Sequence, residues 1–298
     1  MSCNDCDTNY DYESQAVKVS DYYSDVQPTW CSGCGDYAIW AAIKRALVEL
    51  QIPTHEVLFC FDIGCNGNMS DKIKGYRVHS LHGRVLPLAA GAKLANPNVK
   101  VIAFAGDGAT YSEGINHFIN TIRNNYPITL FVHNNGNYGL TTGQASATTH
   151  QGAKRNASPN GPEANTLNPV HLALSLNAPF VARGFSGNIK QLVEIFKEAI
   201  MFQDKGLAYV DILQTCPTFN KEMNNEWYSE RISNHQAPIS KLEEALAFSK
   251  DQDNNIATGI LYKDENSSNF LKRINHDNVS QIDLVRQYNV DQFVQDLI

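Results

Sequence analysis

The sequence lacks an excess of basic residues and has no long apolar run, and each absence excludes a class of protein. Its 24 Lys and Arg residues are outnumbered by 31 Asp and Glu residues, and the net charge of -7 argues against binding to nucleic-acid phosphates. No run approaches the roughly 18 consecutive apolar residues that cross a bilayer. The first 15 residues are acidic and polar, unlike a signal or transit peptide. We therefore expect a cytoplasmic protein with no nucleic-acid or membrane partner.

The seven cysteines are an odd number and do not suit a framework of disulfide bonds. Thiols that stay reduced are more often core residues, nucleophiles or metal ligands. Cys31 and Cys34 form a CxxC pattern, which alone is compatible with zinc, a redox pair or an iron–sulfur cluster. The other CxxC, formed by Cys3 and Cys6, lies in the N-terminal tail and is expected to be an exposed pair that binds no metal. Cys60 is expected in the core of a strand.

Hydrophobic residues make up 43% of the sequence, which is enough for a large core. Segments with two different apolar patterns alternate along the chain, which indicates an α/β protein. Short apolar runs are typical of buried strands, and apolar residues every three or four positions are typical of helices. Strands that alternate with helices predict a mostly parallel sheet with helices on both faces. The expected strands cover residues 57–61, 99–105, 128–132, 208–213 and 256–262, and the expected helices cover residues 36–51, 87–95, 112–124, 169–178, 188–203 and 240–250.

Three regions differ in composition. Residues 1–27 lack hydrophobic periodicity and are expected to form an N-terminal arm. Residues 28–225 are expected to form the main domain, and the more polar residues 226–298 a C-terminal extension. Inside the main domain, residues 136–168 are rich in Gly, Asn, Thr and Pro and have no periodicity. Loops of that length in compact domains are usually functional or disordered, so we expect this loop to contribute to a site.

Four short segments each follow a predicted strand. Ligand sites in parallel α/β sheets gather beyond the carboxyl ends of the strands. We therefore expect these segments to meet at one edge of the sheet and to form the site of the protein. They are residues 62–65, 106–108, 134–135 and 215–216.

Two of these segments have the composition of a phosphate and magnesium site. Glycines in Gly106-Asp107-Gly108 let the backbone approach a phosphate closely, and the helix that follows supplies amide donors. Asp107 offers the hard oxygen that Mg²⁺ prefers, and Asn135 and a backbone carbonyl just beyond it would add neutral oxygens. Each segment alone is more typical of a tight turn or an Asn-rich loop. The two together, separated by one helix and one strand, favour the ligand site.

This arrangement resembles the thiamine-diphosphate motif of the transketolase and pyruvate-decarboxylase superfamily. The resemblance implies that Asp107, Asn135 and the carbonyl of Asn137 hold Mg²⁺. It also implies that thiamine diphosphate is lined by nearby small or apolar residues, namely Gly106, Gly108, Ala109, Gly139 and Leu140.

Cys65 and Cys216 also follow predicted strands, and with Cys31 and Cys34 they supply four thiolates. Four thiolates suit either a tetrahedral zinc site or a [4Fe–4S] cluster. The number of ligands does not distinguish these two sites. The neighbouring thiamine site favours the cluster.

Six segments, in this order, resemble the β subunit of the 2-oxoacid:ferredoxin oxidoreductases: WCSGCGDYAI, DIGCNGN, HSLHGRVLPLAAGAKLANP, FAGDGATYSEGINHFINTIRNN, NNGNYGLTTGQAS and QTCPTFN. They cover roughly residues 22–225. The resemblance implies that four cysteines bind one [4Fe–4S] cluster beside thiamine diphosphate, namely Cys31, Cys34, Cys65 and Cys216. It further implies that the cofactor is touched by Ile63, Gly64, Cys65, Asn66 and His82.

The activity implied by the resemblance is oxidative decarboxylation of a 2-oxoacid, such as 2-oxoglutarate or pyruvate, to acyl-CoA and CO2. Electrons would pass through the cluster to ferredoxin, and coenzyme A would take the acyl group. No catalytic residue of this chain is certain. In this family, the glutamate that activates the aminopyrimidine comes from a partner α (or α and γ) subunit.

Two segments depart from the family pattern and leave the substrate open. Asn66-Gly67-Asn68 and Thr142-Gly143-Gln144 lack the basic residues that many members carry there, which weakens the case for a dicarboxylate such as 2-oxoglutarate. Two other functions stay open. One is a thiamine-diphosphate decarboxylase or synthase that is not coupled to ferredoxin, and the other is a non-catalytic subunit stabilised by a metal.

Overall fold

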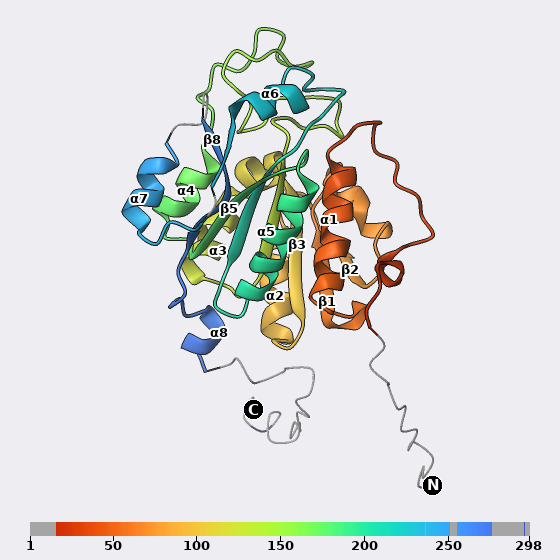
Figure 1. Ribbon diagram of the computed structural model, residues 1–298, viewed down its shortest axis with the longest axis vertical. Coiled ribbons are helices and arrows are strands. Elements are labelled where there is room, and N and C mark those ends of the chain that lie inside the picture. The colour runs from red at the N-terminus through yellow and green to blue at the C-terminus, as the bar shows by residue number, and fades with distance from the viewer. Residues whose placement is uncertain (1–15, 236, 251–254, 276–294, 296–298) are drawn as a thin grey trace.

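An eight-stranded sheet forms the centre of the structure (Figure 1). The computed structural model describes residues 16–235, 237–250, 255–275 and 295. In chain order the strands are β1 (Val57–Phe61), β2 (Tyr76–His79), β3 (Lys100–Gly106), β4 (Thr129–Asn134), β5 (Phe180–Phe185), β6 (Ala208–Leu213), β7 (Ile232–Asn234) and β8 (Ile256–Lys263). Across the sheet they follow the order β2-β1-β3-β4-β6-β5-β8-β7. Neighbouring strands are parallel except β5 and β8, which run antiparallel.

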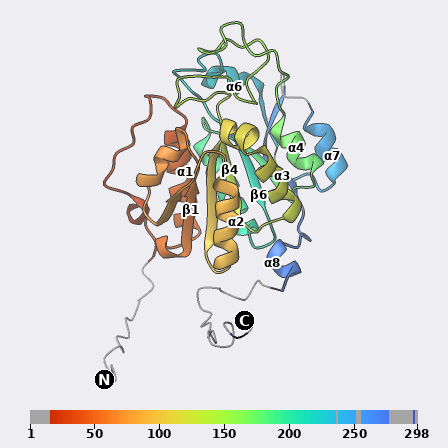
Figure 2. The ribbon, with the colours of Figure 1, turned by 180° about the vertical axis from the view of Figure 1, so that it is seen from behind.

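Helices cover both faces of this sheet. They are α1 (Asp36–Glu49), α2 (Val85–Ala95), α3 (Ile115–Asn124), α4 (Pro169–Ser175), α5 (Ile189–Phe202), α6 (Asn225–Arg231), α7 (Leu242–Phe248) and α8 (Phe270–Arg273). Figure 1 shows α1 and α5 on the near face, and Figure 2, seen from behind, shows α2 and α3 on the other. Within the residues that the structure describes, none of the helices combines the length and the apolar composition needed to cross a membrane.

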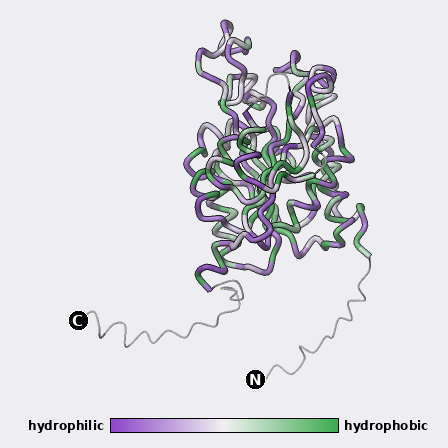
Figure 3. The backbone as a smooth tube through the Cα atoms, turned by 60° about the vertical axis from the view of Figure 1, so that its left-hand side comes forward, coloured by the Kyte–Doolittle hydropathy of each residue, from purple (hydrophilic) through white to green (hydrophobic). Residues whose placement is uncertain are grey.

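The core consists of two layers, one on each face of the sheet. Alternate residues of the central strands point to opposite faces, so Phe59 and Phe61 pack under α1 and α5, whereas Cys60 packs under α2. On the α1 side, the Phe104 ring stacks on Phe61 at 5.3 Å and contacts Phe131 at 5.4 Å. Figure 3 shows the hydrophobic stretches gathered toward the centre of the described structure. Because both faces are covered, the central strands are mostly apolar.

The α/β fold with a mostly parallel sheet is confirmed, and five of its strands lie where the sequence predicts them. Three strands were not predicted. β2 is short and lies at the edge of the sheet, with Tyr76 61% exposed, so it lacks an apolar run. β5 contains a buried arginine, Arg183, which interrupts its apolar pattern and donates to Asp211 on β6 at 2.9 Å. β7 has only three residues.

Residues beyond 225 contribute to the same sheet. β8 pairs with β5, and β7 pairs with β8. The chain between these strands includes α7, which packs against α4 on the face that α2 and α3 also cover. This part of the chain is therefore joined to the main sheet by backbone hydrogen bonds. The tail cysteines Cys3 and Cys6 lie outside the described residues.

The parallel strands end at one edge, as the sequence predicts. Gly106 of β3 lies opposite His133 of β4, and Asn134 of β4 lies opposite Leu213 of β6. The segments that follow β1, β3, β4 and β6 therefore leave the sheet side by side.

Candidate functional site

A cavity of about 100 Å³ opens at this edge of the sheet, and it gathers most of the predicted site residues. Thirteen of the residues predicted to bind the cofactor or Mg²⁺ line it: Ile63, Gly64, Cys65, Asn66, His82, Gly106, Asp107, Gly108, Ala109, Asn135, Asn137, Gly139 and Leu140. Four further lining residues were not predicted, namely His133, Tyr138, Thr141 and Gln214. The structure thus brings together residues that lie far apart in the sequence.

Asp107 is the charged residue at the base of this cavity. Its side chain is buried, and its Oδ2 accepts hydrogen bonds from Ser146 Oγ at 2.5 Å and from Thr148 Oγ1 at 2.8 Å. Burial raises the pKa of this carboxyl to about 6, because desolvation outweighs these hydrogen bonds. Among the described residues that line the cavity there is no Lys or Arg. A buried carboxylate without a cationic side chain is the ligand that a metal ion would stabilise.

The two asparagines predicted to bind Mg²⁺ form a tight turn beside Asp107. Asn135 Oδ1 accepts from the Asn137 backbone N–H at 3.2 Å and from Asn137 Nδ2 at 3.0 Å. Asn135 Nδ2 donates to Gln214 Oε1 at 3.2 Å. In the described ranges, no three or more His, Cys, Asp and Glu residues form a group that could hold one metal ion. A Mg²⁺ site built from one carboxylate and neutral oxygens is not such a group.

Buried polar atoms without a partner are concentrated at the cavity. Five such side-chain atoms occur in the part of the chain that the structure describes, and three belong to cavity-lining residues. They are Asn66 Nδ2, His133 Nε2 and Asn137 Oδ1. Each such atom lowers the free energy of unfolding by about 1–3 kcal/mol while it has no hydrogen-bond partner. The cavity therefore fits a ligand that carries both hydrogen-bond donors and acceptors.

Glycines allow the surrounding loops to approach one another closely. A Cβ on Gly108 would lie 2.3 Å from Cε1 of Tyr138, and a Cβ on Gly139 would lie 3.3 Å from Cys65 Sγ. Gly108 directly precedes a helical turn at Ala109–Glu113. Backbone amides at the start of such a turn are suited to bind phosphate oxygens.

The mouth of the cavity carries a small polar cluster. His82 Nε2 lies 4.0 Å from Glu113 Oε2, and Tyr138 OH donates to Glu113 Oε1 at 2.8 Å. The rings of His82 and Tyr138 contact each other edge to face at 6.0 Å. His82 was predicted, whereas Glu113 was not. Nothing in the sequence distinguishes Glu113 from a solvent-facing residue of the helix.

Hydrogen bonds join the segments that carry the four predicted cluster ligands. Trp30 Nε1 donates to the Cys65 carbonyl at 2.7 Å, which ties the CxxC segment to the end of β1. The Gly35 N–H donates to the Thr215 carbonyl at 3.1 Å, which ties the same segment to the chain before Cys216. Cys31 is exposed, Cys34 and Cys65 are half-buried, and Cys216 is buried. The structure thus brings all four cysteine segments to one region beside the cavity.

The cysteines in this region influence one another. Burial, followed by the charges of Asp36, Cys216 and Cys31, raises the pKa of Cys65 to about 12. Burial, followed by the charge of Asp36, also raises the pKa of Cys34, and Cys216 adds to that shift. A metal bound by these sulfurs would instead lower the pKa values of the thiols, because a coordinating thiol is deprotonated outright. Cys60 lies apart from them in β1, where burial raises its pKa to about 12.

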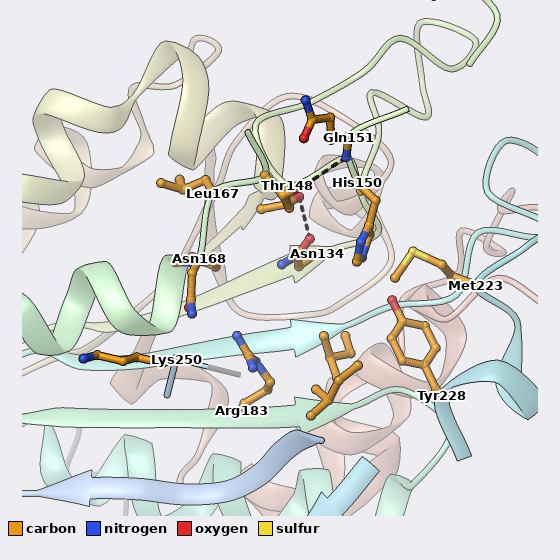
Figure 4. Close-up of a pocket in the computed structure, with 15 residues that line it drawn as sticks. Asn134, Thr148, His150, Gln151, Leu167, Asn168, Arg183, Met223, Tyr228 and Lys250 are labelled. Carbon is orange, nitrogen blue, oxygen red and sulfur yellow. Dashed lines mark hydrogen bonds between the residues drawn. The ribbon is translucent and has the colours of Figure 1, made fainter. Parts of the chain in front are cut away.

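A second cavity, of about 390 Å³, lies beside the first (Figure 4). Its lining includes Asn134, Thr148 and Arg183. Thr148 Oγ1 lies 2.8 Å from Asn134 Oδ1 and 2.8 Å from Asp107 Oδ2, so its one hydroxyl proton is shared between these two acceptors. Asn134 Nδ2 in turn donates to Asp211 Oδ1 at 3.0 Å. Thr148 and Asn134 therefore connect the two cavities. The sequence patterns did not predict this second cavity.

Comparison with known proteins places the chain in a family. A model described as the C-terminal thiamine-pyrophosphate-binding domain of thiamine pyrophosphate enzymes matches residues 62–212. A model of the C-terminal part of the pyruvate ferredoxin oxidoreductase β subunit matches residues 216–278. The β subunit of the 2-oxoacid:ferredoxin oxidoreductase of Saccharolobus solfataricus is 37% identical over 279 residues, which cover 89% of this chain and 91% of that protein. This chain belongs to the family of 2-oxoacid:ferredoxin oxidoreductase β subunits.

Two further relatives extend the comparison. The 2-oxoglutarate oxidoreductase subunit KorB of Mycobacterium tuberculosis is 39% identical over 231 residues, which cover 76% of this chain and 61% of that protein. The 2-oxoglutarate:ferredoxin oxidoreductase of Magnetococcus marinus, solved with 2-oxoglutarate, coenzyme A and succinyl-CoA bound, has a similar structure. Its TM-score is 0.85 at 30% identity, over 96% of this chain and 98% of that chain. The fold and the membership of this 2-oxoacid:ferredoxin oxidoreductase β-subunit family agree with the sequence analysis.

The close approach of Gly108 to Tyr138 leads to a stability prediction. We expect Gly108→Ala to lower the free energy of unfolding by about 1–3 kcal/mol, because the added methyl group displaces the Tyr138 ring. In a Tyr138→Ala background the same change should cost much less, and urea unfolding of the four proteins measures the difference. Gly91→Ala is the matched control, because Gly91 lies inside α2 with free space around it and should gain about 0.5–1 kcal/mol. An equal loss in both backgrounds would show that the ring contact is not the cause.

Proposed function

We propose that this chain holds thiamine diphosphate, Mg²⁺ and a [4Fe–4S] cluster in an enzyme that oxidatively decarboxylates a 2-oxoacid to acyl-CoA. The observation that carries the proposal is the cavity at the strand ends. It gathers all thirteen residues predicted to bind the cofactor or Mg²⁺, together with three unpaired buried polar atoms. Membership of the family supports the same activity. We also propose that the enzyme works in the cytoplasm, where thiols stay reduced.

The residues of the cavity suit the metal and diphosphate end of the cofactor. Asp107, Asn135 and the carbonyl of Asn137 would hold Mg²⁺, and Asp107 supplies the negative charge that the other two lack. The backbone from Gly106 to Ala109 would receive the diphosphate, since these residues line the cavity and Gly108 directly precedes the helical turn at Ala109–Glu113. When bound, thiamine diphosphate supplies the electron sink for loss of CO2. The protein orients it and excludes water.

The cysteines suit a [4Fe–4S] cluster better than zinc. In such a cluster each thiolate binds a different iron, so the four sulfurs need not surround one ion. The region lies next to the cavity, since Cys65 belongs to both. A cluster there would take electrons from the cofactor and pass them to ferredoxin.

A partner subunit would complete the cavity. Its volume of about 100 Å³ is below the roughly 300–1,000 Å³ of pockets that enclose organic ligands. Apolar side chains are exposed at or beside its mouth, with Leu81 78%, Leu140 50% and Ile63 37% exposed. Exposed apolar groups that cluster in this way are typical of a protein interface. We propose that an α subunit covers this mouth and supplies the activating glutamate.

The substrate is a 2-oxoacid, and 2-oxoglutarate and pyruvate are the leading candidates. The relative from Magnetococcus marinus was solved with 2-oxoglutarate and coenzyme A. Because the described lining of this cavity has no Lys or Arg, a second substrate carboxylate would need a cation from the partner.

The first test measures turnover of the complex. We expect the chain, purified without oxygen together with its partner subunit, to reduce viologen when a 2-oxoacid, coenzyme A and thiamine diphosphate are all present. The isolated chain should turn over at least tenfold more slowly, because the activating glutamate is missing. Release of CO2 without coenzyme A and without viologen reduction would instead indicate a decarboxylase that is not coupled to ferredoxin.

The second test concerns the cysteines. Iron analysis of the complex should give about four irons per chain of this type, because one [4Fe–4S] cluster holds four. Cys65→Ser should lower the iron content by more than half, as should Cys216→Ser. Cys60→Ala is the matched control, since Cys60 is buried in β1 away from the site, and it should retain the iron. One zinc and no iron in the wild-type complex would contradict the cluster.

The third test uses the ionisation of Asp107. Because Mg²⁺ binds the ionised carboxylate, we expect the affinity for Mg²⁺ and thiamine diphosphate to fall as the pH drops below about 6, by up to about tenfold per pH unit. The folded-state pKa is raised. Accordingly, the contribution of Asp107 to stability in the metal-free chain is largest when it is protonated and is lost as the pH rises from about 4 to about 6.

Calorimetric titrations between pH 5 and pH 8 would measure this dependence. Asp107→Asn is the control, because its amide does not ionise but has nearly the same shape. The variant should bind more weakly at neutral pH and show only the pH dependence that the diphosphate itself contributes. Identical pH profiles for the wild type and Asp107→Asn would show that Asp107 does not bind the metal.

A further inference from the structure

His133 is a buried residue that lines the cavity and has no role in the cofactor site proposed above. It lies near the end of β4, directly opposite Gly106 of β3, and is 1% exposed. Its ring contacts Phe104 edge to face at 5.8 Å, which fixes it against the aromatic core. His133 Nε2 is buried without a hydrogen-bond partner, and the residue lines the cavity.

Asp36 holds the other nitrogen of this ring. His133 Nδ1 lies 2.6 Å from Asp36 Oδ1, and both side chains are buried. Because a carboxylate only accepts hydrogen bonds, Nδ1–H donates to Asp36. Asp36 is the first residue of α1, where the helix dipole favours a negative charge. The carboxylate thus fixes the orientation of the imidazole, as carboxylates do when they accept from the second ring nitrogen of a metal-binding histidine.

Two observations distinguish this pair from a histidine that only fills the core. A core histidine satisfies both ring nitrogens, because an unpaired buried nitrogen costs about 1–3 kcal/mol. Here one nitrogen is paired at a short distance, and the other is left unpaired beside a cavity with two more unpaired atoms, Asn66 Nδ2 and Asn137 Oδ1. The arrangement is that of a preoriented ligand contact.

We propose that His133 is a further cofactor-binding residue: with Nδ1–H donating to Asp36, Nε2 accepts a hydrogen bond from a donor, such as a metal-bound water, at the metal and diphosphate end of the bound thiamine cofactor. Asp36 is the positioning residue that holds its ring. The inference rests on the function proposed above and deepens it. The neighbours of His133 indicate which end of the cofactor it would contact, namely the metal and diphosphate end. Gly106 lies opposite His133, Asp107 follows Gly106, and Asn135 lies two residues after His133.

Two variants of His133 separate the roles of its two nitrogens. In His133→Asn the amide reaches about as far as Nδ1, so it keeps a donor for Asp36 and removes the unpaired Nε2. In His133→Gln the amide reaches about as far as Nε2, so it keeps a polar group at the cavity and loses the bond to Asp36. Thiamine diphosphate binding is measured by calorimetry on the complex with its partner, at saturating Mg²⁺.

We expect His133→Asn to raise the Kd for thiamine diphosphate about tenfold, which corresponds to the loss of one hydrogen bond of about 1.4 kcal/mol. His133→Gln should raise the Kd by less than about threefold. The melting temperature without cofactor serves as the second readout, because it reports packing alone. The increase in melting temperature on adding Mg²⁺ and thiamine diphosphate should be smaller in His133→Asn than in the wild type.

The outcomes separate this inference from the proposed function. Saturable binding by the wild type with an unchanged Kd in His133→Asn would overturn the inference and leave the function intact. A lower melting temperature without cofactor, combined with a wild-type Kd, would assign His133 a packing role and also overturn it. No saturable binding by the wild-type complex would overturn the function and the inference together.

A milder variant covers the case in which His133→Asn does not fold. Asp36→Asn keeps the shape of the side chain and an acceptor for Nδ1–H but removes the charge that holds the ring. We expect it to weaken thiamine diphosphate binding about threefold at an unchanged melting temperature without cofactor. A wild-type Kd for Asp36→Asn would show that the pair does not orient a cofactor ligand.

Discussion

The cavity at the strand ends depends on how the buried carboxylate of Asp107 is stabilised. Among the described residues four acids are buried within or near the sheet, and three have strong partners. Asp36 pairs with His133, Asp211 pairs with Arg183, and Asp62 accepts backbone N–H bonds from Ile63, Gly83 and Val85. Asp107 has hydroxyl donors, Ser146 and Thr148, and burial raises its pKa, as it also raises that of Asp62. Of the four, it is the one whose charge a bound metal ion would best stabilise.

The stabilisation of Asp107 explains the need for the long loop after β4. Ser146 and Thr148 lie in the region 136–168, which has no periodicity in the sequence, and their hydroxyls reach back to the end of β3. Thr148 Oγ1 also lies 2.8 Å from Asn134 Oδ1, and the amide of Asn134 donates to Asp211. The loop therefore does more than connect β4 to α4. It joins the acid of the cavity to the buried Asp211–Arg183 pair, so the positions of both acids depend on one loop.

The sequence predicts what local patterns determine. Runs such as Val57–Phe61 are apolar because parallel strands are covered on both faces, and glycines mark where loops approach one another closely. It does not reveal contacts between distant segments. His133 has the pattern of a core residue, and Gln214 that of a polar residue after a strand. Their roles depend on Asp36 and Asn135, which other elements supply. β5 was missed for a similar reason, since Arg183 is tolerated inside it only because Asp211 lies on the neighbouring strand.

The cysteine region and the cavity are not independent. Cys34 Sγ lies 3.3 Å from Asp36 Oδ2 and accepts from Gln214 Nε2 at 3.5 Å. Each of these partners contacts a cavity-lining residue, Asp36 through His133 and Gln214 through Asn135. Two short hydrogen-bonded paths therefore run from one sulfur to the wall of the cavity. A change of charge at that sulfur alters the strength of hydrogen bonds along both paths, because buried bonds in a low dielectric polarise one another. The arrangement suits a protein in which a ligand in the cavity exchanges electrons with a group held by the cysteines.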